Sequence, residues 1–412
     1  MKRIIAAIIL IVSLASCHIG KMTSHNFAYL YDRDMLPFIP EYAIFNVNDS
    51  ITSVYYKFNT KNLLYVKQFD EKIFTAKFSL KAQLYENDEM KVLLDSGTVS
   101  LADNNNTVSK DITGNIDLKD KKPGAYILKL TFSDLNKNTT VESHLTVNRG
   151  NRNDRQNFML LNADSVPAYT SYVAAGQEFR LLFNNMKTKK LFVSYYNRDF
   201  PVAVPPYSVS NEKPIDLRAD SSFTVSLTEG STAMLNFTNK GLYHFQADTN
   251  QREGFTLFRF DEDFPDITSL SQMLHPIRYL ATKVEYNDLE DMKNDKEAVD
   301  KFWIENAGNA DRAKQMIKLY YNRVMDANRF FTSYLEGWKT DRGIIYIIYG
   351  PPNVVYKSKN VEVWVYGEDK NMLSINFTFR KLDNPFTDND YSLTRSPAYK
   401  DGWYIAVDNW RR

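Results

Sequence analysis

Segments in which apolar and polar residues alternate recur from about residue 27 to residue 260 of the chain. Ser53 to Phe58, Thr75 to Tyr85 and Tyr126 to Phe132 have this two-residue period, and clusters of Asn, Asp, Gly and Pro separate them. Alternation puts every second side chain on one face, so each segment predicts a strand with one buried face. Short strands at regular spacing are typical of β-sandwiches. We therefore expect a first β-sandwich over residues 27–149.

A second run of the same kind follows Asn148 to Asn157, a polar segment without periodicity that predicts a linker. Gly241-Leu242-Tyr243 occupies the place in this run that Gly124-Ala125-Tyr126 has in the first. The turn Pro-Gly-x-Tyr before a strand resembles turns of immunoglobulin-like and macroglobulin-like modules. We expect a second β-sandwich over residues 156–262, in tandem with the first.

The pattern changes after Pro265, where three- and four-residue apolar steps begin. Asn294 to Glu297 resembles a capping box and predicts a helix from Lys296 to Asn306. A longer helix is predicted from Asn309 to near Gly337, and a closing helix carries Trp403, Val407 and Trp410. Three strands are predicted between these helices, at residues 344–349, 361–366 and 373–380. We expect an α+β domain over residues 266–412.

The first residues have the pattern of an export signal, with Lys2 and Arg3 before an apolar run that ends at Leu14. This run is shorter than the roughly 20 apolar residues of a membrane helix. Leu14-Ala15-Ser16-Cys17 resembles the lipobox of bacterial lipoproteins. The resemblance implies that residues 1–16 are removed, that lipid is attached to Cys17, and that residues 17–26 are a tether to the membrane. The alternative is a signal anchor with a buried free Cys17.

The residues after Cys17 bear on the location of the protein. His18 to Lys21 contains no acidic residue, whereas surface lipoproteins of Bacteroidota-type bacteria tend to carry acidic residues there. We therefore expect an outer-membrane anchor that faces the periplasm. Asp49-Ser50-Ile51 and Asp164-Ser165-Val166 resemble the O-glycosylation sites of such bacteria, which makes Ser50 and Ser165 candidate modification sites.

Glu336 to Pro352 contains the string Gly-Trp-Lys-Thr-Asp-Arg-Gly, followed by an apolar run and Gly-Pro-Pro. This segment resembles the signature of the GWxTD-domain proteins, which are found mainly in Bacteroidota-type bacteria and often as lipoproteins. Phe302-Trp303, Tyr321 to Val324 and Glu362 to Tyr366 fit the same family. The resemblance covers about the last third of the chain and is specific, because several spaced motifs agree. It implies kinship and no particular activity.

The two glycines of the signature predict a sharp corner. Gly337 stands where a helix would end in a left-handed residue, and Gly343 would let the chain enter a crowded sheet. Trp338 would then fold back over the end of the helix. These residues indicate a structural corner between a helix and a strand.

The polar residues of the signature leave two interpretations open. Thr340 and Asp341 offer short acceptors to the backbone of a tight turn. Arg342 could form an ion pair with Glu336, Asp341 or Glu362. The alternative interpretation is a ligand or partner site that uses Asp341 and Arg342.

Composition and spacing exclude several kinds of chemistry. Lys and Arg total 51 against 50 Asp and Glu, so there is no basic excess for nucleic acid. The chain has one Cys, and its five His are scattered without the spacing of metal ligands. There is no Gly-x-Ser-x-Gly elbow and no phosphate loop. We expect no metal and no cofactor.

The leading function is therefore a non-catalytic envelope lipoprotein that binds envelope proteins during assembly or secretion at the outer membrane. A second hypothesis is a module that binds glycan or peptidoglycan through loop aromatics, for which Tyr195, Tyr196, Phe200 and Tyr207 are candidates. The same aromatics could equally be core residues. A third hypothesis is a carboxylate-dependent hydrolase, because the spacing of a carboxylate pair exists only in the fold. The sequence does not fix an oligomeric state.

Overall fold

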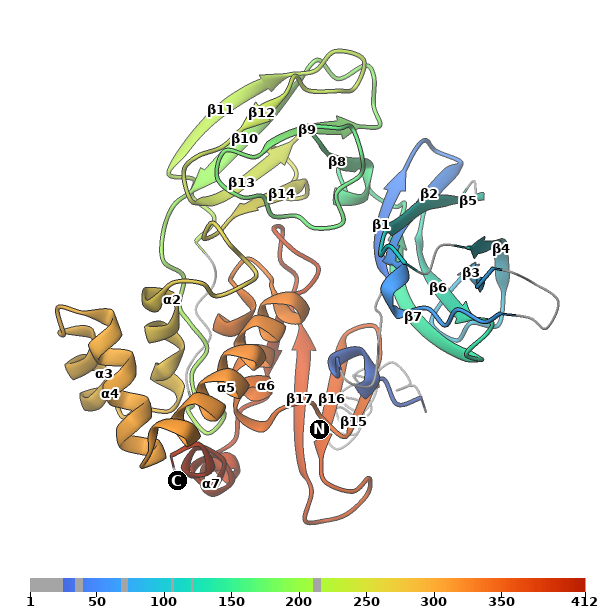
Figure 1. Ribbon diagram of the computed structural model, residues 1–412. Coiled ribbons are helices and arrows are strands. Elements are labelled where there is room, and N and C mark those ends of the chain that lie inside the picture. Colours follow the sequence, from blue (N-terminus) through green and yellow to red (C-terminus); the bar gives the residue numbers. More distant parts are fainter. Residues whose placement is uncertain are drawn as a thin grey trace, which may run out of the picture.

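The computed structural model describes residues 25–33, 40–67, 73–104, 107–119, 122–209 and 216–411. The predicted export signal and Cys17 lie outside these ranges. The described chain forms two β-sandwiches and an α+β part, with the sandwiches at the top and upper right of the view in Figure 1. This is the predicted fold class. No helix within the described ranges is both long and apolar enough to cross a membrane.

The first sandwich pairs a three-stranded sheet, in the order β1-β2-β5, with a four-stranded sheet, in the order β4-β3-β6-β7. Its strands are β1 (Glu41–Asn46), β2 (Ile51–Asn59), β3 (Ala76–Tyr85), β4 (Leu93–Asp103), β5 (Asp111–Lys119), β6 (Ala125–Asp134) and β7 (Thr139–Asn148). Every second residue of β3 is buried, as the alternation of its sequence predicts. The rings of Phe58, Phe78 and Phe132 meet in the core between the two sheets.

The second sandwich repeats the strand order of the first. Its sheets have the orders β8-β9-β12 and β11-β10-β13-β14, so the first, second and fifth strands form one sheet in both sandwiches. The strands are β8 (Phe158–Asn162), β9 (Glu178–Phe183), β10 (Lys190–Tyr196), β11 (Ser221–Ser226), β12 (Leu235–Asn236), β13 (Gly241–Gln246) and β14 (Phe255–Arg259). Tandem sandwiches of one topology therefore underlie the faint sequence repeat.

A tyrosine at the start of the sixth strand has the same role in both sandwiches. The hydroxyl of Tyr126 donates a hydrogen bond to the carbonyl of Lys122 at 2.7 Å, and that of Tyr243 donates to Asn239 at 2.9 Å. In each case the acceptor lies four residues earlier. This is the tyrosine corner of immunoglobulin-like sandwiches. The similarity of Gly124-Ala125-Tyr126 to Gly241-Leu242-Tyr243 thus reflects one structural device used twice.

The α+β part is a four-stranded antiparallel sheet with helices packed on it. Its sheet has the order β15 (Val354–Lys357), β16 (Val361–Tyr366), β17 (Ile375–Lys381) and β18 (Tyr391–Leu393). Its α-helices are α2 (Leu270–Leu274), α3 (Lys283–Glu290), α4 (Asp295–Ala307), α5 (Ala310–Phe331), α6 (Asp341–Tyr349) and α7 (Lys400–Trp410). Short 3-10 turns are η4 (His275–Tyr279), η5 (Gly337–Lys339) and η6 (Pro397–Tyr399). Trp364, Phe377 and Phe379 of the sheet share one core with α5 and α6, which lie beside it in Figure 1.

Two helices of this part begin at N-cap residues that the sequence indicates. The side chain of Asn294 caps α4 and that of Asn309 caps α5, both where the sequence predicts a start. The predicted strand at residues 344–349 is wrong, because these residues belong to α6. Residues 344–348 are all buried, and a short run of buried residues cannot be told from a buried strand by its pattern alone.

The N-terminal segment packs in the core of the α+β part, and Phe27 and Tyr29 also contact β7 of the first sandwich. The sequence places residue 27 at the start of that sandwich, yet Phe27, Ala28 and Tyr31 lie in the core of the α+β part. The last two belong to a short 3-10 turn, η1 (Ala28–Tyr31). The amide of Phe27 donates to the carbonyl of Val355 at 2.8 Å, so the segment extends the edge of the sheet at β15. This pairing joins residues far apart in the chain, which no local pattern indicates.

The polar segment between the sandwiches is ordered by side-chain amides and includes η3 (Arg155–Asn157). The Oδ1 of Asn157 accepts from the Nδ2 of Asn46 at 3.2 Å and from the Nδ2 of Asn184 at 3.0 Å. Asn46 belongs to the first sandwich, and Asn184 follows β9 of the second. Asn157 therefore links the two sandwiches where the sequence predicts only a linker.

Candidate functional site

The two signature glycines allow backbones to pack in direct contact. The expectation for Gly337 is wrong: α5 already ends at Phe331, and Gly337 does not have a left-handed backbone. A Cβ on Gly337 would lie 1.8 Å from the carbonyl oxygen of Ala327. A Cβ on Gly343, which lies in α6 and not at a strand, would be 1.9 Å from the carbonyl oxygen of Gly337. Any larger residue would push η5 away from α5, or α6 away from η5.

Trp338 is held in the core beside the end of α5. Its amide donates to the Oδ1 of Asn328 at 3.1 Å, and its carbonyl accepts from the hydroxyl of Tyr279 at 3.1 Å. Its ring packs edge-on against the ring of Tyr279. Trp338 is thus bound to α5 through Asn328 and to η4 through Tyr279.

Thr340 caps α6. Its Oγ1 accepts from the amide of Gly343 at 3.1 Å and donates to the carbonyl of Gly337 at 2.8 Å. One hydroxyl therefore satisfies a free donor of the helix, and it adds a second donor to the Gly337 carbonyl, which also accepts from the amide of Thr340. This side-chain cap is the reason that the chain turns into a helix at Asp341.

Asp341 reaches away from its own turn to Arg395. Its Oδ1 lies 2.6 Å from Nη2 of Arg395, its Oδ2 lies 2.9 Å from Nη1, and the amide of Leu393 donates to Oδ2 at 2.7 Å. This is the two-bond arrangement that planar guanidinium and carboxylate groups favour. Arg395 is not predicted from the sequence, because it lies 54 residues after Asp341 and belongs to no motif.

The Asp341–Arg395 pair also holds the Pro-rich loop of the second sandwich, residues 201–206. Nη2 of Arg395 donates to the carbonyl of Val204 at 3.2 Å. The amide of Ala203 donates to the carbonyl of Lys339 at 2.8 Å, and the amide of Ser396 donates to the carbonyl of Pro206 at 3.1 Å. We call this set of contacts the loop clamp. It fastens the second sandwich to the α+β part at the signature motif.

Arg342 pairs with Glu362, one of the three partners that the sequence allowed, at 3.3 Å. Both side chains are only 3% exposed. Nη2 of Arg342 also donates to the carbonyl of Asn389 at 3.0 Å, and the guanidinium carbon lies 3.9 Å from the ring centre of Tyr391. The guanidinium is thus enclosed by a carboxylate, a carbonyl and an aromatic face.

Glu362 collects donors from three separate segments. Besides Arg342, it accepts from Nζ of Lys357 at 3.1 Å, from the hydroxyl of Tyr31 at 3.1 Å and from Nε1 of Trp364 at 3.2 Å. Tyr31 comes from the N-terminal segment, so the carboxylate ties that segment to the sheet. We call Glu362, Arg342, Lys357 and Tyr31 the buried ion cluster.

The charges of this cluster decide the ionisation of Glu362. Burial alone would raise the pKa of the carboxyl group, but Lys357 and Arg342 outweigh burial and lower the pKa to about 2. The carboxylate therefore keeps its charge at neutral pH and is poorly suited to exchange protons there. The pairing of this carboxylate with two cations stabilises the folded state.

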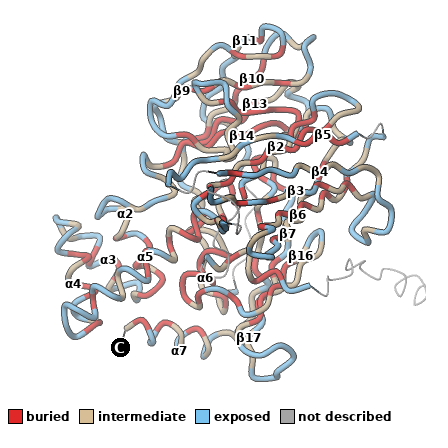
Figure 2. Tube along the Cα trace, turned by 45° about the vertical axis from the view of Figure 1, so that its right-hand side comes forward, coloured by how far each residue is buried: buried red, intermediate tan, exposed pale blue. Residues whose placement is uncertain are grey.

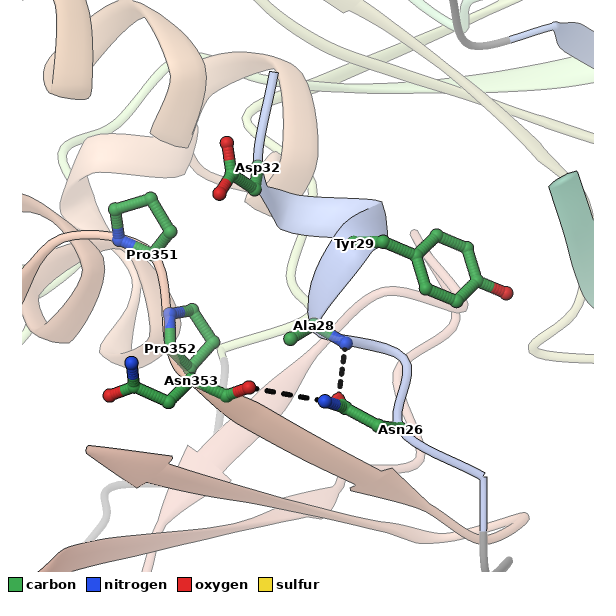
Figure 3. Close-up of a pocket in the computed structure, with 7 residues that line it drawn as sticks. All are labelled: Asn26, Ala28, Tyr29, Asp32, Pro351, Pro352 and Asn353. Atoms are coloured by element: carbon green, nitrogen blue, oxygen red, sulfur yellow. Dashed lines mark hydrogen bonds between the residues drawn. The ribbon is translucent and has the colours of Figure 1, made fainter. Parts of the chain in front are cut away.

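A small hollow lies between the N-terminal segment and the turn that follows Gly350 (Figure 3). Its volume is about 250 Å³, and its lining is formed by Asn26, Ala28, Tyr29, Asp32, Pro351, Pro352 and Asn353. The side chain of Asn26 is already bonded to the carbonyl of Asn353 and to the amide of Ala28. Within the described ranges, no three His, Cys, Asp or Glu side chains gather as metal ligands would.

The loop aromatics pack between the second sandwich and the α+β part. Tyr196 meets Phe386, Phe200 meets Tyr334, and Tyr207 meets Tyr404. Tyr195 packs instead on Tyr243 within the sandwich. These contacts agree with the core interpretation for Tyr195, Tyr196 and Phe200, whereas Tyr207 pairs with the exposed Tyr404 at the surface.

The two candidate modification sites lie in turns. Ser165 is exposed and has a left-handed backbone with φ of 62°. Ser50 is half-buried in the turn between β1 and β2, and its amide donates to Oδ1 of Asn48.

Comparison with known proteins identifies the C-terminal part of the chain. A family model described as the GWxTD domain matches residues 241–412, so the match begins at β13 and includes the last two strands of the second sandwich. No curated protein matches the chain. Among solved structures, the crystal structure of CBD12 from CALX1.2 has 10% identity and a TM-score of 0.14, covering 60% of this chain and 86% of that one. The chain is a GWxTD domain-containing protein.

Proposed function

We propose that this protein is a non-catalytic lipoprotein of the cell envelope, anchored by lipid on Cys17 and facing the periplasm from the outer membrane. In this proposal it binds envelope proteins during assembly or secretion. The observation that carries the proposal is that the charged groups of the signature bind other parts of the same chain. Asp341 binds Arg395, and Arg342 binds Glu362 and Asn389. A catalytic site would need such groups to face a substrate.

The signature supports a binding role by fixing two segments in one surface. The loop clamp holds residues 201–206 against the α+β part, and Tyr207 follows directly. The rings of Tyr207 and Tyr404 have centres 5.6 Å apart, with their hydroxyl groups at 3.2 Å. This pair joins the second sandwich to α7.

Exposed apolar residues lie close in sequence to both members of this tyrosine pair. Ile405 of α7 is 64% exposed, and Val209, two residues after Tyr207, is 80% exposed. Aromatic and aliphatic side chains together on a surface are typical of protein-binding sites. We propose that Tyr207, Val209, Tyr404 and Ile405 form the surface that binds an envelope protein, and we call it the α7 surface.

A photo-crosslinking residue in place of Ile405 tests this function in native envelopes. We expect one protein to be crosslinked at this position and the yield to fall strongly when Tyr404→Ser is added, because the tyrosine pair supports the surface. The control carries the same residue in place of Val108, which is 58% exposed on the first sandwich. Equal crosslinking from both positions would contradict the proposal, and crosslinks to peptidoglycan alone would favour the glycan hypothesis instead.

A further inference from the structure

The tip of the hairpin between β16 and β17 presents two adjacent apolar side chains to solvent. Met372 is 99% exposed and Leu373 is 90% exposed. The hairpin projects below the helices in Figure 1, and Figure 2 shows its tip as exposed. Single exposed apolar residues are common on soluble proteins, but two neighbouring large ones at a projecting tip indicate contact with an apolar phase.

Hydrogen bonds within the tip hold these side chains outward. The amide of Leu373 donates to Oδ1 of Asn371 at 2.9 Å, and the hydroxyl of Ser374 donates to the carbonyl of Glu368 at 2.7 Å. The hydroxyl of Tyr356 donates to Asp369 at 2.9 Å and ties the tip to β15. The tip is therefore a built turn.

The N-terminal segment is attached at the base of the same hairpin. Nδ2 of Asn26 donates to the carbonyl of Asn353 at 3.1 Å, and Oδ1 of Asn353 accepts from the amide of Gly367 at 2.8 Å. Gly367 is the first residue after β16. Asn26 lies nine positions after Cys17, and a fully extended chain of that length spans about 30 Å. Lipid on Cys17 would thus keep this end of the molecule close to the bilayer.

The shape and charge of the tip favour lipid over a protein partner. A stable protein interface buries about 800 Å² on each partner, which a convex tip of two side chains does not offer. The interfacial region of a bilayer accepts any convex apolar group. The tip also carries Glu368, Asp369 and Lys370, so it has no basic excess that would attract anionic lipids.

We infer that Met372 and Leu373 insert into the bilayer interface beside the lipid anchor, as a second point of membrane contact. This inference rests on the lipid anchor of the proposed function. A single flexible tether leaves the orientation of a protein free, whereas two contacts fix it. The hairpin then faces the membrane while the second sandwich projects away from it.

A fluorescent label at position 373 tests the inference in the lipidated protein. Cys17 is the one cysteine of the chain, so with lipid on it Leu373→Cys supplies a unique thiol for an environment-sensitive dye. The position is exposed, so the substitution should not disturb folding. In phosphatidylethanolamine and phosphatidylglycerol vesicles we expect a blue-shifted emission and several-fold quenching by brominated lipid chains. Added salt should not change either signal, because the contact is apolar.

The matched control carries the dye at Met186→Cys, which is 69% exposed on the second sandwich and should remain unquenched. If the lipidated protein floats with vesicles but position 373 behaves like position 186, the inference is overturned and the anchor stands. If position 373 is shielded in native envelopes but unquenched in pure lipid, a protein covers the tip and the inference is overturned. If Cys17→Ser floats as well as the wild type, the anchor of the proposed function fails instead.

Discussion

Gly337→Ala is expected to lower the free energy of unfolding by about 3 kcal/mol or more. The added Cβ would lie 1.8 Å from the carbonyl oxygen of Ala327 and 2.7 Å from Cα of Asn328, so it meets backbone of α5 that cannot swing aside. Overpacking a filled site usually lowers the free energy of unfolding by about 1–3 kcal/mol. A clash with a helix backbone should cost at least the upper value of this range, because the backbone cannot move aside. Urea unfolding followed by tryptophan fluorescence measures the change, with Trp338 as a nearby reporter.

The control for this prediction is Gly176→Ala. Gly176 has a left-handed φ of 71°, but nothing lies within 4 Å of the added Cβ. Gly176→Ala should lower the free energy of unfolding only by the strain of an alanine in a left-handed conformation, about 1–2 kcal/mol. If Gly337→Ala costs no more than this control, close packing is not the reason for glycine in the signature.

Glu362→Gln is expected to destabilise the protein by about 3–5 kcal/mol at neutral pH, because it leaves Arg342 buried without its counter-charge. The size of the effect should depend on pH. The pKa of Glu362 lies at about 2 in the folded protein, below its ordinary value of 4.5, so its charge stabilises the fold fully above about pH 4.5. That stabilisation is lost as the pH falls from about 4.5 towards 2. The difference between wild type and variant should therefore shrink in acid.

Glu336→Gln is the matched control, since it makes the same substitution at a glutamate whose ion pair is more exposed. Glu336 pairs with Lys339 at 2.9 Å, and both side chains are partly exposed. Such a pair contributes about 0–1 kcal/mol. Denaturant unfolding of both variants between neutral and acid pH gives the comparison. Equal losses of stability for the two variants would refute the role of the buried ion cluster.

The elements that the sequence predicted well are those whose signals are local. Alternating residues located the sandwich strands, and the caps Asn294 and Asn309 located α4 and α5. The element that it mistook is α6, where a short run of buried residues cannot be told from a buried strand by its pattern alone. Thr340 was the sequence signal that could have identified α6 as a helix. Threonine is a common N-cap residue, and here its side chain accepts from the amide of Gly343 in the first turn.

The contacts that the sequence could not predict are those between distant segments. Arg395 meets Asp341 across 54 residues, and Tyr31 meets Glu362 across 331. Neither partner belongs to a motif, so only the fold brings them together. The signature is predicted to be a corner between a helix and a strand, whereas in the structure it joins α5 through η5 to a second helix, α6. Its wider role, fastening the second sandwich and the N-terminal segment to one sheet, appears only in three dimensions.

The central claim is that the signature fastens parts of this chain together and is not itself a binding site. Hydrogen exchange of Asp341→Asn tests it most directly, because the loop clamp includes the amides of Ala203 and Ser396. We expect peptides containing these two amides to exchange at least about tenfold faster. This corresponds to a loss of about 1.4 kcal/mol in the free energy of local opening, while the exchange rates in β9 should not change. Asp401→Asn, an exposed residue of α7, is the control and should leave exchange at both amides unaltered. Unchanged exchange at Ala203 and Ser396 in Asp341→Asn, together with lost crosslinking at position 405, would contradict the claim and make Asp341 part of a binding site.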